Sequence, residues 1–97
     1  MKARYKKTIQ ADEDIIALYG DGVRMFGVRQ AEAYVARLMD LFELIAEQPG
    51  LARERSEFNP PVRLHFHESH VVVYRLDDDG VLIVRVLNGR EDWIRNL

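Results

Sequence analysis

The apolar residues of this chain change their spacing once, and the change limits the folds that the chain can adopt. In the first half they recur every three or four residues, as on one face of a helix, whereas from Val62 onward they alternate, as in a strand. Helices that come first and strands that come afterwards are typical of an α+β fold with separate layers. We therefore predict an α+β domain.

The chain is expected to begin with a short strand over residues 3–7 and a helix after it. Thr8 is a good N-cap, and the acids of residues 12–14 lie where they favour the positive end of a helix. Gly27 ends this helix. Its predicted apolar stripe consists of Ile15, Leu18, Tyr19, Val23 and Phe26.

A second, longer helix is predicted from Val28 to the break at Pro49-Gly50. Its apolar residues keep a helical period for about five turns, which is the strongest local pattern in the chain. Two amphipathic helices joined by a few residues form an antiparallel hairpin, whose stripes another layer must cover. The stripe of the second helix consists of Ala31, Tyr34, Val35, Leu38, Leu41, Phe42 and Ile45.

The second half is expected to form three consecutive antiparallel strands after a solvated connector over residues 51–61. The strands are residues 62–67, 70–76 and 81–87, and the turn over residues 77–80 is rich in Asp and ends in Gly. The predicted element order is therefore β-α-α-β-β-β. The two turns predict the cross-strand pairs Leu76–Val81, Tyr74–Ile83, Val72–Arg85, Phe66–Val71 and His65–Val72.

These pairs divide the strand residues between the two faces of the sheet. We assign the more apolar face to the helix hairpin, and it holds Val62, Leu64, Phe66, Val71, Val73, Arg75, Leu82, Val84 and Val86. The other face is expected to stay uncovered and to bind a partner protein. It holds Arg63, His65, Val72, Tyr74, Leu76, Val81, Ile83, Arg85 and Leu87. A register shift of one residue would exchange the two faces. In a second alternative, the C-terminal tail folds back through Trp93 and Ile94 and covers the face that we expect to be uncovered.

The composition narrows the function classes. Lys and Arg number 14 against 16 Asp and Glu, so the net charge of −2 does not favour DNA binding by the chain itself. The absence of cysteine excludes disulfides, thiolate zinc sites and cysteine nucleophiles. No apolar stretch is long enough to span a membrane. We therefore expect one cytoplasmic domain over residues 1–97 that needs no metal or cofactor and no membrane.

Two groups of side chains could carry chemistry. His65 and His67 lie on one side of a strand, a spacing that can bind metal, although no cysteine or matching carboxylate accompanies them. On the face predicted to be uncovered, Arg63, His65, Tyr74 and Arg85 could supply the base, the acid and the cation that RNA cleavage by 2′-hydroxyl attack requires. The alternative is that Tyr74 packs in the core and that the arginines pair with acids.

Five segments of the chain carry a family resemblance. They are residues 26–34, the break at Pro49, Ser69-His70-Val71-Val72-Val73-Tyr74-Arg75, Asp78-Asp79-Gly80-Val81, and residues 83–92 with their Gly89-Arg90-Glu91-Asp92 ending. Together they resemble the ParE toxins of the RelE/ParE superfamily over nearly the whole chain. The chain departs from that family at Asn88, where members commonly carry a histidine, and at Gly20-Asp21-Gly22, which loosens the first helix.

The resemblance implies the β-α-α-β-β-β fold and a growth-arresting, plasmid-stabilising toxin of a type II toxin–antitoxin system. It also implies inhibition of DNA gyrase by binding, and neutralisation by a ParD-like antitoxin in a hetero-oligomer. The RelE branch instead cleaves messenger RNA on the ribosome, and Arg63, His65 and Arg85 keep that alternative open. Because every lysine precedes Thr8, the lysine-rich pocket of the nuclease branch is absent, and we favour an inhibitor over an enzyme. A stand-alone adaptor module, a third class, predicts no growth arrest.

Two sets of contact residues follow from this interpretation. Trp and Arg are frequent interface anchors, so Arg90, Trp93 and Arg95 are the predicted contacts with the target, unless Trp93 caps the sheet. The antitoxin is expected to lay an amphipathic segment along the uncovered face, or to add a strand at an edge. The floor of that predicted antitoxin site consists of Val72, Tyr74, Leu76, Ile83 and Leu87.

Overall fold

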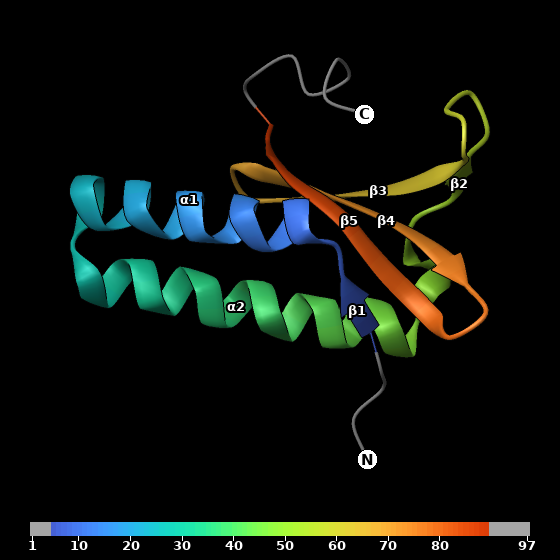
Figure 1. Ribbon diagram of the computed structural model, residues 1–97. Helices are drawn as coiled ribbons and strands as arrows, with labels where there is room; N and C mark the ends of the chain where they lie inside the picture. The colour runs from blue at the N-terminus through green and yellow to red at the C-terminus, as the bar shows by residue number, and fades with distance from the viewer. Residues whose placement is uncertain (1–4, 90–97) are drawn as a thin grey trace.

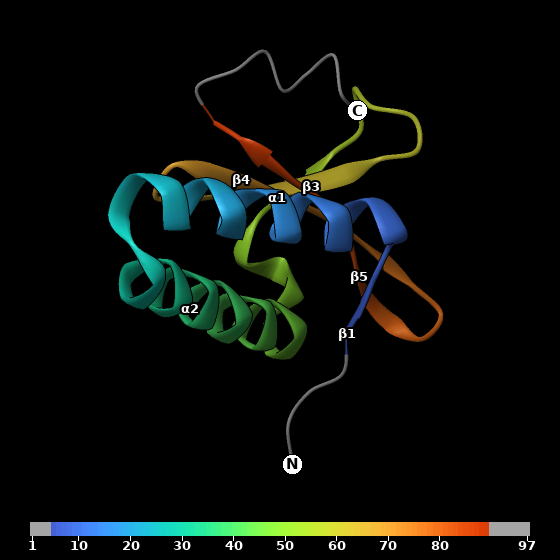
Figure 2. The same cartoon turned by 60° about the vertical axis from the view of Figure 1, so that its left-hand side comes forward.

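The computed structural model describes residues 5–89 and shows two helices packed side by side on one face of a five-stranded sheet (Figure 1, Figure 2). The α+β class and the predicted order of elements are confirmed, with one additional strand. In chain order the elements are β1 Tyr5–Lys7, α1 Ile9–Phe26, α2 Val28–Glu47, a 3-10 turn Pro49–Leu51, β2 Glu54–Arg55, β3 Val62–His67, β4 His70–Asp77 and β5 Gly80–Asn88.

The ends of the helices lie where the sequence predicted them. The Thr8 hydroxyl accepts a hydrogen bond from the Ala11 N–H at 3.0 Å, which caps α1 and confirms the predicted N-cap. Gly27 separates the helices at a φ of 91°, a conformation that favours glycine. Neither α1 nor α2 has the length and apolar character that a membrane-spanning helix needs.

The sheet has the strand order β1-β5-β4-β3-β2. β1 pairs in parallel with β5, and all other neighbours are antiparallel. Four of the predicted pairs are confirmed: Leu76–Val81, Tyr74–Ile83, Phe66–Val71 and His65–Val72. The strand β2 lies inside the predicted connector and pairs with the start of β3, and its two residues are too few to produce a periodic pattern.

The fifth predicted pair is wrong, because β5 contains a β-bulge. Tyr74 pairs with Ile83 but Val73 pairs with Arg85, so Val84 is the extra residue and Val72 lies opposite Val86. The bulge shifts the alternation of side chains along the rest of β5. Val86 therefore joins the core beneath the helices, and Leu87 lies in a second cluster on the opposite face.

The predicted assignment of the two faces is also wrong, because the helices cover the other side of the sheet. Val72, Tyr74 and Ile83 are fully buried beneath α1 and α2, so they do not form an open floor for an antitoxin. Leu87 belongs to the opposite cluster, and Leu76 is exposed at the end of β4. The helix-side core consists of Ala11, Ile15, Leu38, Leu41, Phe42, Ile45, Val72, Tyr74, Val81, Ile83 and Val86.

The apolar residues on the face away from the helices are less exposed to solvent than the sequence predicted. Its cluster consists of Val62, Leu64, Val71, Val73 and Leu87, with Phe58 and Val84 packed against it. Each of those five residues is at most 8% exposed. The predicted cover by Trp93 and Ile94 lies outside the described residues, and so does the predicted target contact of Arg90, Trp93 and Arg95.

Candidate interaction surface

The two arginines of the predicted nuclease group hold the fold together. Arg63 Nη1 donates to the Ala52 carbonyl at 2.6 Å, in the segment between α2 and β2. Arg85 donates from Nε and Nη2 to the two carboxylate oxygens of Asp14 on α1, at 2.8 and 3.0 Å. The hydrogen bond with Asp14 raises the pKa of Arg85 above its ordinary value. Both cations are thus engaged with the chain itself.

Asp14 also satisfies the backbone of the bulge. The Val86 N–H, just past the extra residue of β5, donates to the Asp14 carboxylate at 2.9 Å. At the extra residue itself, the Thr8 hydroxyl donates to the Val84 carbonyl at 2.7 Å. The N-cap and the N-terminal turns of α1 therefore bind the irregular part of β5 at two successive points and fix α1 on the sheet.

Tyr74 and His65, the other members of the predicted nuclease group, face the helices. Tyr74 is fully buried, and its hydroxyl donates to the Pro49 carbonyl at 2.8 Å and accepts from the Ala52 N–H at 3.2 Å. Burial raises the pKa of Tyr74 and lowers that of half-buried His65, which nearby His67 lowers further. Tyr74 is therefore closed to a substrate. Within residues 5–89, no cluster of three His, Asp or Glu side chains could hold a metal ion.

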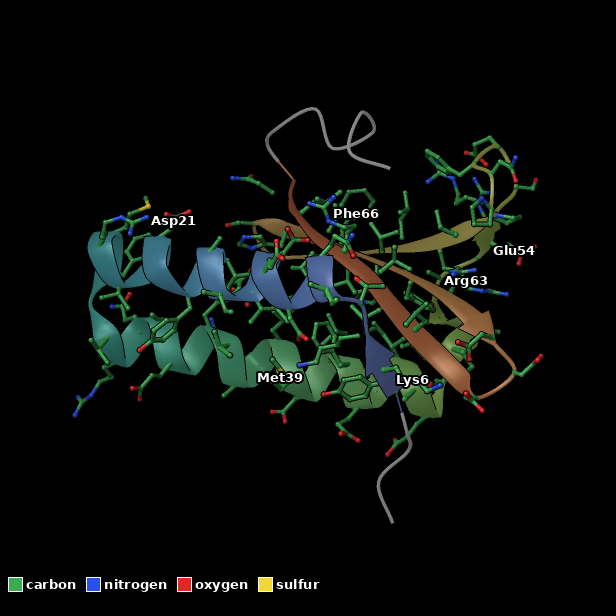
Figure 3. The ribbon with its side chains drawn as sticks, in the orientation of Figure 1. Lys6, Asp21, Met39, Glu54, Arg63 and Phe66 are labelled. Carbon is green, nitrogen blue, oxygen red and sulfur yellow. The ribbon has the colours of Figure 1, made fainter. Side chains whose placement is uncertain are left out.

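A hollow of about 690 Å³ lies between the tip of the helix hairpin and the nearby end of the sheet. Figure 3 shows Asp21 at this tip and Arg63 at the opposite end, near β2. Residues from the end of α1, the start of α2, the β3–β4 turn and the end of β5 line the hollow. We call it the hairpin-tip hollow, and its walls include Leu18, Met25, Phe26, Tyr34, His70 and Asn88.

Apolar side chains are exposed around this hollow. Met25 is 71% exposed, Phe26 62% and Val28 52%, although the sequence pattern placed Phe26 in the buried stripe of α1. That assignment of Phe26 is wrong, because the sheet ends before the hairpin does. Gly22 brings the helices together here, since a Cβ on it would lie 3.3 Å from the Ala31 Cβ. In the sequence, the only indication of this exposed surface was the run of large apolar residues on both sides of Gly27, at the turn between the helices.

Polar side chains join the hollow to the β3–β4 turn. Tyr34 Oη lies 2.6 Å from His70 Nδ1, and Arg37 donates to the two carboxylate oxygens of Glu68 at 3.1 and 3.4 Å. The Arg37 guanidinium also lies 5.4 Å from the centre of the Tyr34 ring. Asp21 pairs with Arg24 on the same helix. Both acids that line the hollow are therefore neutralised by arginines.

The histidine in this wall, His70, is expected to make the stability of the fold depend on pH. Burial and the neighbouring His67 lower the pKa of His70, against the smaller opposing influence of Asp21 and Glu68. The unfolded chain therefore takes up a proton at higher pH than the folded chain. We expect stability to fall as the pH drops below about 6.5, by at most ~1.4 kcal/mol per pH unit for this histidine. Urea unfolding of the wild type and His70→Gln at several pH values measures it, and equal slopes in both would contradict the assignment.

Comparison with known proteins gives one consistent result. Residues 5–93 match a family described as the ParE toxin of the type II toxin–antitoxin system parDE. The chain is 31% identical over 87 residues to toxin ParE3 of Caulobacter vibrioides, covering 90% of this chain and 87% of that protein. It is 32% identical over 98 residues to toxin ParE1 of Mycobacterium tuberculosis, covering both completely.

The fold also matches a solved structure, titled as a chromosomal ParDE toxin–antitoxin system from P. aeruginosa. The TM-score is 0.76 at 20% sequence identity, and the match covers 90% of this chain and 96% of that one. At this sequence identity the match shows that the two proteins share a fold, and nothing more.

Proposed function

Because the chain belongs to the ParE toxin family of type II toxin–antitoxin systems, we propose that it inhibits DNA gyrase by binding and is neutralised by a ParD-like antitoxin. The family membership supports the toxin–antitoxin part of this proposal. The assignment of gyrase as the target rests on the sequence resemblance to ParE toxins, a family that implies inhibition of gyrase by binding.

One structural observation carries the choice of binding over catalysis. A nuclease needs an acid, a base and a cation within hydrogen-bond reach of the substrate. Here Tyr74 is fully buried, Arg63 holds the Ala52 carbonyl and Arg85 holds Asp14. Using these groups on RNA would require the chain to break contacts that fix its own helices to its sheet. We therefore propose that the toxin acts without chemical turnover.

The proposed contacts with gyrase are Arg90, Trp93 and Arg95. They rest on residue type, since Trp and Arg supply most of the binding energy in many protein interfaces. The competing interpretation, in which Trp93 caps the sheet, predicts that Trp93→Ala lowers stability. Contact with the target predicts instead that Trp93→Ala weakens inhibition while the free energy of unfolding changes little.

The test compares two activities of the purified, antitoxin-free protein. We expect it to stop DNA supercoiling by gyrase at concentrations close to that of gyrase, because a binding inhibitor acts stoichiometrically. Messenger RNA on ribosomes should stay intact in a parallel reaction. Adding the antitoxin should restore supercoiling. Cleaved messenger with unaffected gyrase would contradict the proposal in favour of a nuclease, and no effect in either reaction would contradict it in favour of an adaptor.

A further inference from the structure

The hairpin-tip hollow and the apolar residues beside it have no role in the function proposed so far. We propose that this surface binds a second copy of the same chain in a two-fold symmetric dimer. Each copy places Phe26 in the hollow of the other. This inference goes beyond the proposed function, because it concerns the chain alone and requires neither gyrase nor an antitoxin.

The tip of the hairpin leaves a patch of apolar side chains in contact with water. Met25, Phe26 and Val28 are 52–71% exposed within four positions of the chain. Side chains of these sizes expose roughly 300 Å² together, and apolar patches of that size on a monomer are often functional. The tip also projects past the sheet, so another molecule can reach it (Figure 1). The patch is therefore a candidate interface.

The same surface carries both an exposed aromatic ring and a hollow that can receive one. Phe26 is 62% exposed and stands at the rim of the hollow, whose walls include Leu18 and Tyr34. The volume of about 690 Å³ is within the range of roughly 300–1,000 Å³ that is usual for binding pockets, so a phenylalanine side chain fits. A two-fold interface uses one patch on both copies, so that patch must be complementary to itself. An apolar side chain next to an apolar hollow meets this requirement.

The charges at the two ends of the hollow favour one orientation of the two-fold axis. Arg24 pairs with Asp21 on α1, and Arg37 pairs with Glu68 at the β3–β4 turn. All four side chains are 45–71% exposed, so a second copy can contact them. An axis that crosses the hollow between its ends places Arg24 opposite Glu68 of the second copy. An axis along the hollow places each arginine opposite itself, and like charges in contact are unfavourable. The charges therefore favour the crossing axis.

The area of this surface predicts a weak and reversible dimer. The apolar side chains and the walls of the hollow, counted on both copies, amount to an interface on the order of 1,000 Å². Stable complexes bury at least about 1,200 Å², and smaller interfaces belong to transient ones. We therefore expect a dissociation constant in the micromolar range, with monomers at low concentration.

Analytical ultracentrifugation of the full chain, free of antitoxin, measures this association between about 1 and 200 μM. We expect the molar mass of the wild type to rise with concentration from that of a monomer towards that of a dimer. Met25→Ser/Phe26→Ser removes the inserted side chain and should weaken association by at least about 30-fold. Both side chains are exposed, so the fold should tolerate the change. Ile16→Ser is the matched control and should associate as the wild type does, because Ile16 is 71% exposed on α1 and does not line the hollow.

Exchanging charges tests the orientation of the axis. Arg24→Glu alone and Glu68→Lys alone each place like charges opposite each other twice in the dimer, so each should associate about fivefold more weakly than the wild type. In an equimolar mixture each variant supplies the charge that the other lacks. Association should therefore return to the level of the wild type in the mixture.

A wild-type chain that stays monomeric over the whole range of concentrations would overturn this inference and leave the hollow to a different protein. Equal association of the wild type and Met25→Ser/Phe26→Ser would overturn it as well, because the dimer would then use another surface. A mixture of Arg24→Glu and Glu68→Lys that associates no better than either variant alone would overturn the crossing axis. All of these measurements are made without gyrase, so each result leaves the proposed function standing.

Discussion

Replacing Tyr74 by alanine is expected to lower the free energy of unfolding by about 4 kcal/mol, the largest loss that we predict for one substitution. Tyr74 is fully buried in the helix-side core, so the change leaves a cavity beneath α1 and α2. It also removes the hydroxyl that binds Pro49 and Ala52 after α2. Domains of this size have only about 5–15 kcal/mol of stability in total. Urea unfolding followed by circular dichroism measures the loss.

Two further variants separate the causes. Tyr74→Phe keeps the ring and loses only the hydroxyl, which should cost about 1–2 kcal/mol because two backbone groups lose their partner. Leu76→Ala lies two residues further along β4, where the side chain is 47% exposed, and should cost less than about 1 kcal/mol. Equal losses for Tyr74→Ala and Leu76→Ala would mean that the helices do not cover this face.

The second large effect is expected for Asp14→Ala. This carboxylate accepts hydrogen bonds from the Arg85 guanidinium and from the Val86 N–H of the bulge. Removing one partner of a buried ion pair costs about 3–5 kcal/mol, and we expect about 2–3 here because the side chains of Asp14 and Arg85 are 16% and 26% exposed. The measurement is again urea unfolding, at neutral pH.

The control for Asp14 is an ion pair on the surface. Asp21 pairs with Arg24 on α1, but both side chains are more than 60% exposed, so Asp21→Ala should cost at most about 1 kcal/mol. Asp14→Asn keeps an acceptor for the Val86 N–H and should fall between the two alanine variants. A loss for Asp14→Ala no larger than that for Asp21→Ala would show that the helix does not depend on this contact.

Local patterns predicted the elements well, because each depends on nearby residues. The cap at Thr8, the stop at Gly27 and the period of α2 are all set within a few residues of where they act. The turn between β4 and β5 is equally local, and its residues predicted the pairs beside it correctly. Two features of the sheet could not be predicted from nearby residues. They are the two-residue strand β2 and the parallel pairing of β1 with β5.

The faces of the sheet could not be predicted in the same way. Val71, Val72 and Val73 are consecutive and all fully buried, so alternation along β4 does not say which side the helices take. The bulge at Val84 depends on Thr8 and Asp14, which are more than 70 residues earlier in the chain. Since the predicted nuclease group and the predicted antitoxin floor both used that assignment, the error in the faces carried over to both.

The hairpin-tip hollow was missed for a related reason. The helical period of α1 continues to Phe26, and period alone predicts that a residue on the stripe is buried. Whether it is buried depends on where the sheet ends, which is a property of the assembled fold. The tip of the hairpin projects past the sheet (Figure 1). Phe26 therefore becomes part of an exposed surface instead of the core.

The most direct test of the account is gyrase supercoiling in the presence of the double variant Arg63→Gln/His65→Gln. The account predicts that this variant inhibits gyrase at the same concentration as the wild type, because both residues pair with β4 residues of the helix-side core and Arg63 binds the Ala52 carbonyl of the chain itself. A folded variant that has lost growth arrest, while the wild-type protein cleaves messenger RNA and leaves gyrase active, would contradict it.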